Sequence, residues 1–421
     1  MLKILLNRIS NGENPSLEEI VETFSPFIPL LCKLKDTSQD PHWHAEGDVY
    51  VHTSWVLQEL YKLLNQEQAV LTPQRRLALI LATAFHDIAK PLTTREKEID
   101  GQMRIVAPHH EEMGASYLAP LLLDCGLPYR VLYQILQLVA AHIVPKRLVI
   151  TGAGKPLYYK LARQADLELL YYLTKADMLG RLCIDKELQV GHIDMFRLYV
   201  EEYGLWGKAG PYSEWPDTIK NELPNSSTEL IDYVLGYGAK DFENGLIHTP
   251  YEAVARAYPH LEHHPELVLT CGIGGSGKST WAQQTLPDHT LISLDDLREL
   301  HSKNRGDQSN NALVLNIAME SLKEKLRKKE RIVWDATNLR REMREKIIRI
   351  AENYHALVTL VVFHPNKIEL GKRNKSRKHP IAEEVINKQL ERFQWPQPTE
   401  AHRFLILDCN GSRLLSTGYS H

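Results

Sequence analysis

The chain has 421 residues, 43% of them hydrophobic and 24% charged, with a formal net charge of −3. This length is too great for one comfortable core and predicts two domains or slightly more. The net charge gives no sign of a nucleic-acid partner, and no stretch approaches the ~20 apolar residues of a membrane span. Five scattered cysteines without a C-x-x-C pair predict a reducing, cytoplasmic setting.

The N-terminal half has the periodicity of helices. Apolar residues recur at three and four positions in 53–64, 75–89, 111–125, 130–142, 164–183 and 194–205, and strand-like alternation is scarce. The proline-containing stretch 206–227 predicts a loop or an inter-domain crossing, and two short helical patterns follow it. We therefore expect an all-α domain over 1–205 and a linker with bridging helices over 206–265.

Beyond residue 265 the pattern changes to short β-rich runs that alternate with helices. Strands are predicted at 266–273, 290–294, 331–335, 355–363 and 403–408. Helical patterns lie between them at 278–285, 296–301, 312–329, 341–352 and 382–393. This alternation is typical of a parallel α/β sheet and predicts a second domain over 266–421. That domain holds 25 basic and 19 acidic residues, against 25 and 34 in the rest of the chain, which is compatible with phosphate binding.

A glycine-rich stretch, GIGGSGKST, follows the first of these strands and opens a helix. It fits G-x-x-x-x-G-K-[ST], whose backbone N–H groups cradle phosphate oxygens at a helix N-terminus. A glycine turn with a chance lysine is the alternative, which the strand–loop–helix context disfavours. Lys278 is expected to reach the β- and γ-phosphates and Ser279 to bind Mg²⁺. The predicted nucleotide-binding residues are Gly272, Gly274, Gly275, Ser276, Gly277, Lys278, Ser279 and Thr280.

Later strand ends carry the other parts of a phosphotransferase. In SLDDLR, Asp295 and Arg298 stand one helical turn apart at the edge where open α/β sheets bind ligands. Asp295 can accept the proton of an attacking hydroxyl, and Arg298 can hold a phosphate on the acceptor. Asp335 ends RIVWD, where a carboxylate binds Mg²⁺ or its waters. Arg373 and Arg377 fall on one face of a basic helical stretch, which is either solvated surface or a lid that supplies arginine to the transferring phosphate.

The set GSGKST, LDDLR, DATN and KRNKSR resembles the 5′-hydroxyl polynucleotide kinase family of phage and bacterial type, over nearly all of 266–421. The resemblance implies a P-loop α/β fold with a helical lid, and ATP or another NTP with Mg²⁺ as cofactors. It implies that Asp295 is the general base and that Arg298 grips the phosphate 3′ to the terminal nucleoside. Arg377 matches the lid arginine, and Arg373 is a weaker match. Small-molecule kinases share the P-loop and lid, but D-D-x-R and D-x-T-N favour the polynucleotide branch.

Histidines and aspartates recur at helix ends in the N-terminal half. FHDIAK (85–90) ends an apolar run and, taken alone, is more simply a capped helix end than half of a metal site. Together the candidates form an ordered set of four imidazoles and two carboxylates, which suits one or two divalent transition metals better than Mg²⁺ or Ca²⁺. The set is His52, His86, Asp87, His110, His142 and Asp177.

The order of these ligands resembles the HD phosphohydrolase superfamily over roughly residues 40–185, and HAEGDVYVHT and ADMLGR resemble the HD domain attached to some bacterial tRNA nucleotidyltransferases. The resemblance implies a core metal site formed by His52, His86, Asp87 and Asp177. His110 and His142 complete a second site in two-metal members, where bound metals direct water at a phosphoester.

Other polar residues near these ligands have simpler expected roles. Lys90, one turn beyond His86, is expected to face the metals and reach a substrate phosphate. We expect His44 and His109 to be bystanders, although His109 replaces His110 if the register is off by one. The linker histidines are expected to be solvated; they are His260, His263 and His264.

The tandem resembles bacterial HD-domain polynucleotide kinases and predicts an end-healing enzyme. The kinase phosphorylates 5′-OH ends of RNA or DNA, and the HD domain removes a 2′,3′-cyclic phosphate or 2′-phosphate from the other end. No K-x-[DHN]-G ligase motif is present, so a separate ligase is expected, and a homodimer is compatible with the sequence. Two alternatives stay open: a nucleoside-type kinase joined to an HD nucleotidase, and a regulatory protein that binds a nucleotide signal.

Overall fold

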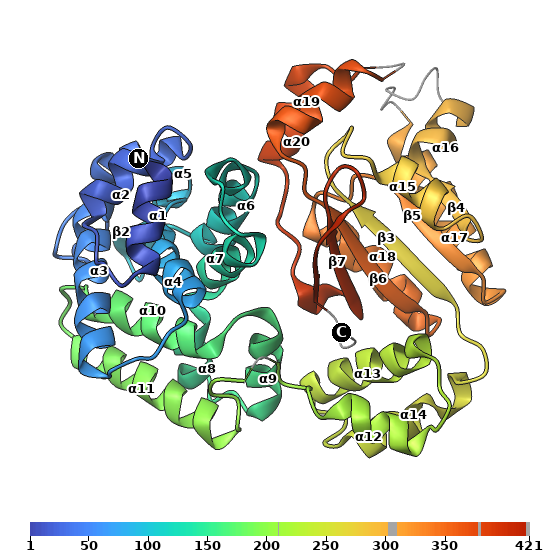
Figure 1. Cartoon of the computed structure of the whole chain (residues 1–421), viewed down its shortest axis with the longest axis horizontal. Coiled ribbons are helices and arrows are strands. Elements are labelled where there is room, and N and C mark those ends of the chain that lie inside the picture. Colours follow the sequence, from blue (N-terminus) through green and yellow to red (C-terminus); the bar gives the residue numbers. More distant parts are fainter. Residues whose placement is uncertain (209, 302–309, 378–379, 418–421) are drawn as a thin grey trace. The chain divides into compact units, whose positions relative to one another are not determined.

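The structure is a computed structural model that describes residues 1–208, 210–301, 310–377 and 380–417. The chain divides into two compact units, Met1–Pro211 and Tyr212–His421. The first unit is helical and the second is built around a sheet (Figure 1). No helix among the described residues is long and apolar enough to cross a membrane.

The first unit packs its helices around α4 (Pro73–Phe85), which is buried over most of its length. From Leu77 to Phe85 every residue of α4 is buried, because α1, α3, α7 and α10 surround it. The helices of this unit are α1 (Leu2–Ser10), α2 (Leu17–Phe24), α3 (Val49–Gln66), α5 (Lys90–Thr93), α6 (His110–Leu122), α7 (Tyr129–Ala141), α8 (Val144–Ile150), α9 (Lys155–Gln164), α10 (Leu167–Leu179) and α11 (Lys186–Glu202). The all-α expectation is therefore confirmed in outline.

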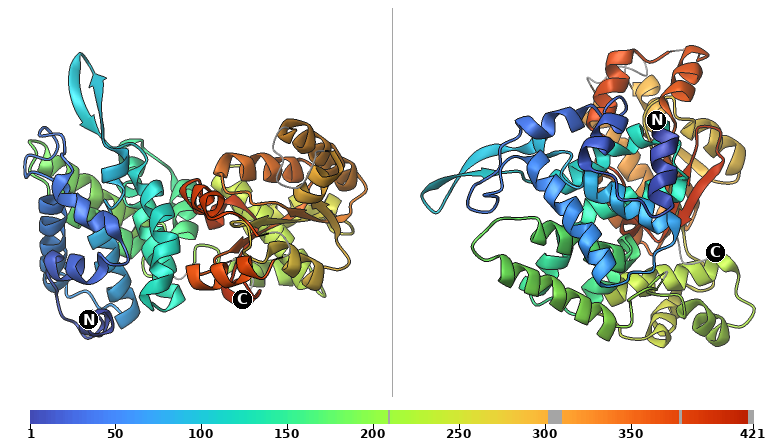
Figure 2. Two further views of the ribbon diagram at one scale, coloured as in Figure 1. Left: turned by 90° about the horizontal axis from the view of Figure 1, so that it is seen from above. Right: turned by 60° about the vertical axis from the view of Figure 1, so that its left-hand side comes forward.

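Two local features of this unit differ from the sequence expectation. The helix predicted over 75–89 ends at Phe85, so that His86 and Asp87 lie in a turn before α5. A hairpin of β1 (Arg95–Ile99) and β2 (Gln102–Val106) also forms, where no strand was predicted. Asp100 and Gly101 at its tip have φ of 51° and 76°, the left-handed pair that tight hairpins require. The hairpin projects from the helices of its unit (Figure 2).

The second unit contains a six-stranded sheet of order β4-β5-β3-β6-β7-β8. Five strands are parallel and β8 pairs antiparallel with β7. Every side chain of the central β3 is buried, as a strand covered on both faces requires. The strands are β3 (Glu266–Cys271), β4 (Thr290–Ser293), β5 (Arg331–Asp335), β6 (Leu357–Phe363), β7 (Arg403–Leu407) and β8 (Arg413–Thr417). The predicted α/β fold is confirmed, and β8 is the strand that the sequence pattern missed.

The helices of the second unit begin before the sheet. They are α12 (Trp215–Glu222), α13 (Thr228–Glu243), α14 (Pro250–Ala257), α15 (Lys278–Thr285), α16 (Leu294–His301), α17 (Asn311–Arg327), α18 (Arg341–Asn353), α19 (Lys367–Lys375) and α20 (Glu383–Glu391). Most of the stretch expected as a linker, 206–265, therefore belongs to the second unit. Tyr237 on α13 donates a 2.9 Å hydrogen bond to the carbonyl oxygen of Ala356, just before β6.

The linker histidines are partly buried, contrary to expectation. The His264 ring stacks on Tyr233 at 4.2 Å between centroids, and the His260 ring stacks on His355 at 3.8 Å. His263 is exposed, as expected. Aromatic neighbours from α13 and from the turn before β6 explain the difference, because they give these rings apolar surface to cover.

The parallel strands place their carboxyl ends at one edge of the sheet. β3 leads into the glycine-rich loop, β4 into Asp295 and β5 into Asp335. Ser293 pairs in register with Asp335, so the ends of β4 and β5 lie side by side. This is the edge at which open α/β sheets bind their ligands.

Candidate functional sites

The six candidate ligands of the first unit converge, although they come from five places in the chain. His52 lies on α3, His86 and Asp87 in the turn after α4, and the rest at α6, the end of α7 and α10. Their ligand atoms form two groups, each within 4.8 Å: His52, His86 and Asp177, and then Asp87, His110 and His142. The structure thus brings together every residue of the predicted set. It also settles the register, because His109 is exposed at the N-cap of α6.

Three of the histidines are held in the same way. The Nδ1 atom lies 2.8 Å from the carbonyl oxygen of Thr83 in His86, 2.7 Å from that of Ala107 in His110, and 2.8 Å from that of Val139 in His142. A carbonyl oxygen only accepts, so each Nδ1 donates its proton to the carbonyl, and each Nε2 faces the cluster. Metal-ligating histidines are oriented by hydrogen bonds of this kind.

The Nε2 atoms of these histidines lie close to one another and to the ligand carboxylates. His110 Nε2 lies 3.3 Å from His142 Nε2, within hydrogen-bond distance. His86 Nε2 is buried and forms no hydrogen bond, at 3.2 Å from an Asp87 oxygen and 3.9 Å from an Asp177 oxygen. Buried imidazole nitrogens and carboxylate oxygens gathered this closely offer several ligand atoms to a cation. These residues therefore fit one or two divalent metals of the transition series.

Two cations neutralise the ligand carboxylates. Burial would raise the pKa of Asp87, but His86 and then Lys90 outweigh it and hold that pKa well below the usual range. Burial would also raise the pKa of Asp177, but Arg181 and His52 outweigh it and hold that pKa well below the usual range. Lys90 Nζ is 2.7 Å from Asp87 Oδ2, and Arg181 Nη2 is 2.7 Å from Asp177 Oδ2. Both carboxylates are thus ionised and ready to bind metal at neutral pH.

A buried glutamate, which the sequence patterns did not single out, orients His52. The Glu46 side chain is 0% exposed, and its Oε1 lies 2.8 Å from both His52 Nδ1 and His44 Nδ1. Its Oε2 accepts a 2.8 Å hydrogen bond from the backbone N–H of Leu182. Burial would raise the pKa of Glu46, but the two histidines lower it, so the carboxylate accepts and His52 Nε2 is left facing Asp177 at 3.1 Å. His44 is therefore no bystander: it shares this carboxylate and lines the adjoining pocket.

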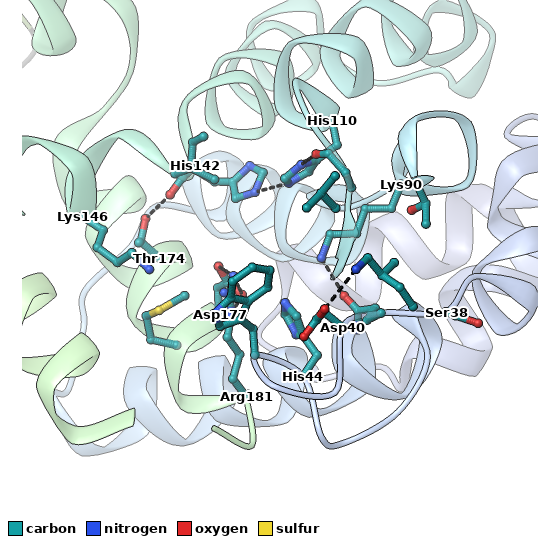
Figure 3. A pocket seen from close by; sticks show the side chains of 18 residues that line it. Ser38, Asp40, His44, Lys90, His110, His142, Lys146, Thr174, Asp177 and Arg181 are labelled. Carbon is teal, nitrogen blue, oxygen red and sulfur yellow. Dashed lines mark hydrogen bonds and ion pairs between the residues drawn. The ribbon is translucent and has the colours of Figure 1, made fainter. Parts of the chain in front are cut away.

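A pocket of about 260 Å³ opens onto these ligands (Figure 3). Metal-site residues in its lining are His110, His142 and Asp177. Cationic side chains in the lining are Lys90, Lys146 and Arg181, and Trp43 adds an aromatic ring. Lys90 lies as predicted, beside the metal ligands, and its Nζ also donates a 2.7 Å hydrogen bond to Gln39. The concentration of positive charge favours an anionic substrate.

The glycine-rich loop of the second unit has the backbone that its sequence requires. Gly275 and Gly277 have φ of 85° and 100°, and a Cβ on Gly277 would lie 2.5 Å from the carbonyl oxygen of Cys409. Lys278 is buried and donates a 2.8 Å hydrogen bond to the carbonyl oxygen of Ile273. Burial lowers the pKa of Lys278, against the attraction of carboxylates at Asp335 and Asp295. The loop is therefore shaped around a position for phosphate.

Side chains from the neighbouring strand ends complete this site. Ser279 Oγ donates a 2.5 Å hydrogen bond to Asp335 Oδ2, which pairs the two expected Mg²⁺ ligands. Arg298 Nη1 lies 2.5 Å from Asp295 Oδ1. Arg298 lines a cavity of about 300 Å³ together with two further arginines that the sequence patterns did not single out, Arg340 and Arg392.

The helical lid lies over the glycine-rich loop. A Cβ on Gly275 would be 4.0 Å from Arg377 Nη1, and one on Gly277 would be 3.4 Å from Arg373 Nη2. Arg373 lies within α19, but Arg377 lies in a bend beyond the end of that helix, so the two do not share one helical face. Gln389 on α20 accepts a 2.6 Å hydrogen bond from the backbone N–H of Gly274. Sequence reasoning missed Gln389, because an isolated amide in a helix carries no motif.

Comparisons with known proteins agree with this two-part architecture. Residues 49–181 match the model of the HD domain, and residues 267–396 match a model described as an AAA domain. The chain combines an HD domain with a P-loop kinase-like domain. No curated protein matches it. Among solved structures it is similar to a gluconokinase from Sinorhizobium meliloti, at 20% identity and a TM-score of 0.27, over 35% of this chain and 84% of that one.

Proposed function

We propose that the protein heals broken nucleic-acid ends: the second unit phosphorylates 5′-OH ends, and the first removes a 2′,3′-cyclic phosphate or a 2′-phosphate. The observation that carries this proposal is a cavity lined by three arginines, Arg298, Arg340 and Arg392, of which Arg298 is paired with Asp295. An acceptor that is itself a small neutral molecule needs no such cluster. A phosphodiester strand offers the anionic groups that arginine binds in bidentate fashion.

In the kinase step the 5′-oxygen of the acceptor attacks the γ-phosphorus of the NTP and the bond to the β–γ bridging oxygen breaks. Asp295 accepts the proton of the attacking hydroxyl, while Arg298 holds it through the adjoining phosphate. Lys278 and the loop N–H groups bind the donor phosphates. Ser279 and Asp335 would hold Mg²⁺, which neutralises charge on the donor when bound. Arg377, and Arg373 more weakly, lie where they stabilise the transferring phosphoryl group.

In each HD turnover one water adds to the phosphorus and one P–O ester bond breaks. A cyclic phosphate therefore needs two turnovers: the first opens it to a phosphomonoester, and the second breaks the remaining ester bond and releases inorganic phosphate. His52, His86, Asp87 and Asp177 would hold one divalent metal, with His110 and His142 available for a second. Such metals polarise the phosphoryl group and supply an activated nucleophile at neutral pH. The chain's own part is orientation: Lys90 and Arg181 keep the ligand carboxylates ionised and fixed.

One assay tests both activities. An RNA with a 5′-OH and a 2′,3′-cyclic phosphate is incubated with the protein, ATP and a panel of divalent metals, and both ends are mapped. We expect 5′-phosphate and 3′-OH ends. Asp87→Asn should abolish only the 3′ reaction, and Asp295→Asn only the 5′ reaction, whereas the neighbouring exposed control Asp296→Asn should change neither.

Free nucleosides offered in parallel separate end-healing from nucleotide metabolism. Preferential phosphorylation of a free nucleoside over the RNA end would overturn the polynucleotide assignment and leave the kinase assignment standing. No change at either RNA end under any metal would overturn the proposal as a whole. Turnover that survives both Asp87→Asn and Asp295→Asn would contradict the sites assigned here.

A further inference from the structure

The HD pocket contains one lysine whose charge is not used by the metal ligands. Lys90 and Arg181 are both committed to ligand carboxylates. Lys146, on α8 four residues after His142, lines the same pocket and forms no hydrogen bond or ion pair within the described part of the chain. Its side chain extends toward Thr174 at the pocket wall (Figure 3). The half-buried Lys146 ammonium has no carboxylate at ion-pair distance among the described residues, although Asp177 and Asp185 attract it from further away, and it fits a site that receives an anion.

An aromatic ring lies at the same pocket. Trp43 is 38% exposed, although it belongs to the pocket lining together with Asp40 and Ile105. The loop that carries it is fixed: the Asp40 carboxylate is buried and accepts hydrogen bonds from the backbone N–H groups of His42, at 2.9 Å, and Ile105, at 3.0 Å. Asp40 thereby joins the Trp43 loop to β2 of the hairpin. The indole has the Arg104 guanidinium over its ring, 5.7 Å from the centroid, and the His42 ring packed edge-to-face at 5.9 Å; its exposed part at the pocket offers a stacking surface for a flat ring.

We propose that Lys146 and Trp43 form a subsite for a terminal nucleotide in the HD pocket, with Lys146 binding the phosphate that is hydrolysed and Trp43 stacking on the base. This inference rests on the proposed phosphoesterase activity and names what the site recognises: a phosphorylated nucleoside at a strand end rather than a phosphate ester of any kind. Stacking does not depend on base identity, so the subsite accepts any terminal base. Lys146 is a substrate-binding residue that does not contact the metals.

The test compares two oligoribonucleotides that end in a 2′,3′-cyclic phosphate and differ only in whether the terminal residue carries a base. Trp43→Ala should raise KM for the RNA with a terminal base by about 5- to 150-fold, the range that loss of one stacked base gives, and leave the base-free RNA unchanged. Trp55→Ala is the matched control, because Trp55 is 41% exposed on α3 and is not part of the pocket.

Inorganic phosphate tests the lysine separately. Lys146→Met should raise KM for both RNAs and weaken competitive inhibition by phosphate at least tenfold, because an ion pair with an anion is lost. Lys146→Arg should retain most of the affinity, and Arg147→Met, an exposed neighbour, should retain all of it. Metal affinity and thermal unfolding of each variant, measured alongside, should match the wild type and so exclude a general folding defect.

The outcomes separate the subsite from the proposed function. If the wild type hydrolyses neither RNA, both the proposed phosphoesterase activity and the proposed subsite are refuted. If the wild type hydrolyses the RNA ends but Trp43→Ala affects the two substrates equally, the stacking assignment is wrong and the activity stands. If phosphate inhibits Lys146→Met as strongly as the wild type, the phosphate assignment is wrong.

Discussion

Replacement of Glu46 by glutamine tests the metal centre at a residue outside the six predicted ligands. Three nitrogens converge on this carboxylate: His44 Nδ1 is hydrogen-bonded to Oε1, His52 Nδ1 lies 2.8 Å from the same oxygen, and the backbone N–H of Leu182 donates to Oε2. Glutamine has nearly the same shape but only one acceptor oxygen. Whichever way the amide lies, one donor meets the NH₂ group, and either His52 loses its orientation or the Leu182 contact breaks.

The expected result is a 10- to 100-fold loss of metal affinity, the usual effect of removing an orienting carboxylate, which corresponds to ~1.4–2.7 kcal/mol. Titration calorimetry with Mn²⁺, Co²⁺ and Zn²⁺ on metal-free protein measures it directly. Glu67→Gln is the control, because Glu67 accepts side-chain hydrogen bonds from Tyr171 and Arg197 in the same unit and contacts no predicted ligand. Equal metal affinity in Glu46→Gln and wild type, with a folded protein, would refute the orienting role.

Further predictions concern the lid, acid stability and the core of the second unit. Arg377→Ala should lower kcat for 5′ phosphorylation by about 10³-fold, measured by single-turnover kinetics, because a guanidinium on the transferring phosphate is lost; an effect on KM alone would contradict this. Burial lowers the pKa of His44 to about 3, against ~6.5 in an unfolded chain, so the unfolded state binds the extra proton between these values. The contribution of His44 to the free energy of unfolding is complete above pH 6.5 and falls as the pH drops toward 3, by up to ~1.4 kcal/mol per pH unit. In urea titrations at several pH values, His44→Asn should make this fall in the free energy of unfolding less steep. Arg344→Met should destabilise the second unit by about 3–5 kcal/mol, because it leaves the buried Glu400 carboxylate without the guanidinium whose Nε and Nη2 atoms lie 2.7 and 3.0 Å from its oxygens. Denaturant unfolding followed by tryptophan fluorescence measures this loss of stability.

The sequence predicts most of the fold, because its signals are local. The glycine-rich loop and the β-rich runs required only neighbouring residues, and each predicted strand of the sheet is present. The hairpin at 95–106 was missed, although Asp100-Gly101 is the usual signal for its turn, because its mostly exposed strands lack apolar alternation. The end of α4 was placed four residues late for a related reason: Ile88 and Ala89 are buried and continue the apolar pattern past the helix.

The site residues likewise differ in whether a local sequence signal marks them. The six candidate ligands could be found because histidine and aspartate are conspicuous at helix ends, and the structure brings them together. Glu46, Lys146 and Trp43 could not, because a single glutamate, lysine or tryptophan has no distinctive spacing and gains its place only through tertiary contacts. The roles of all these residues in turnover remain predictions for the experiments above.

The hydrogen bond from Gly274 to Gln389 has a consequence for the order of events in the kinase unit. In this conformation the amide oxygen of Gln389 satisfies an N–H group of the phosphate loop. A phosphate oxygen that takes the same N–H must displace the amide, so the donor replaces one acceptor with a charged one instead of filling an unsatisfied position. Since Gln389 belongs to α20, that exchange frees the helix from the loop. Binding of the donor at this N–H therefore replaces one of the contacts that hold the lid against the loop.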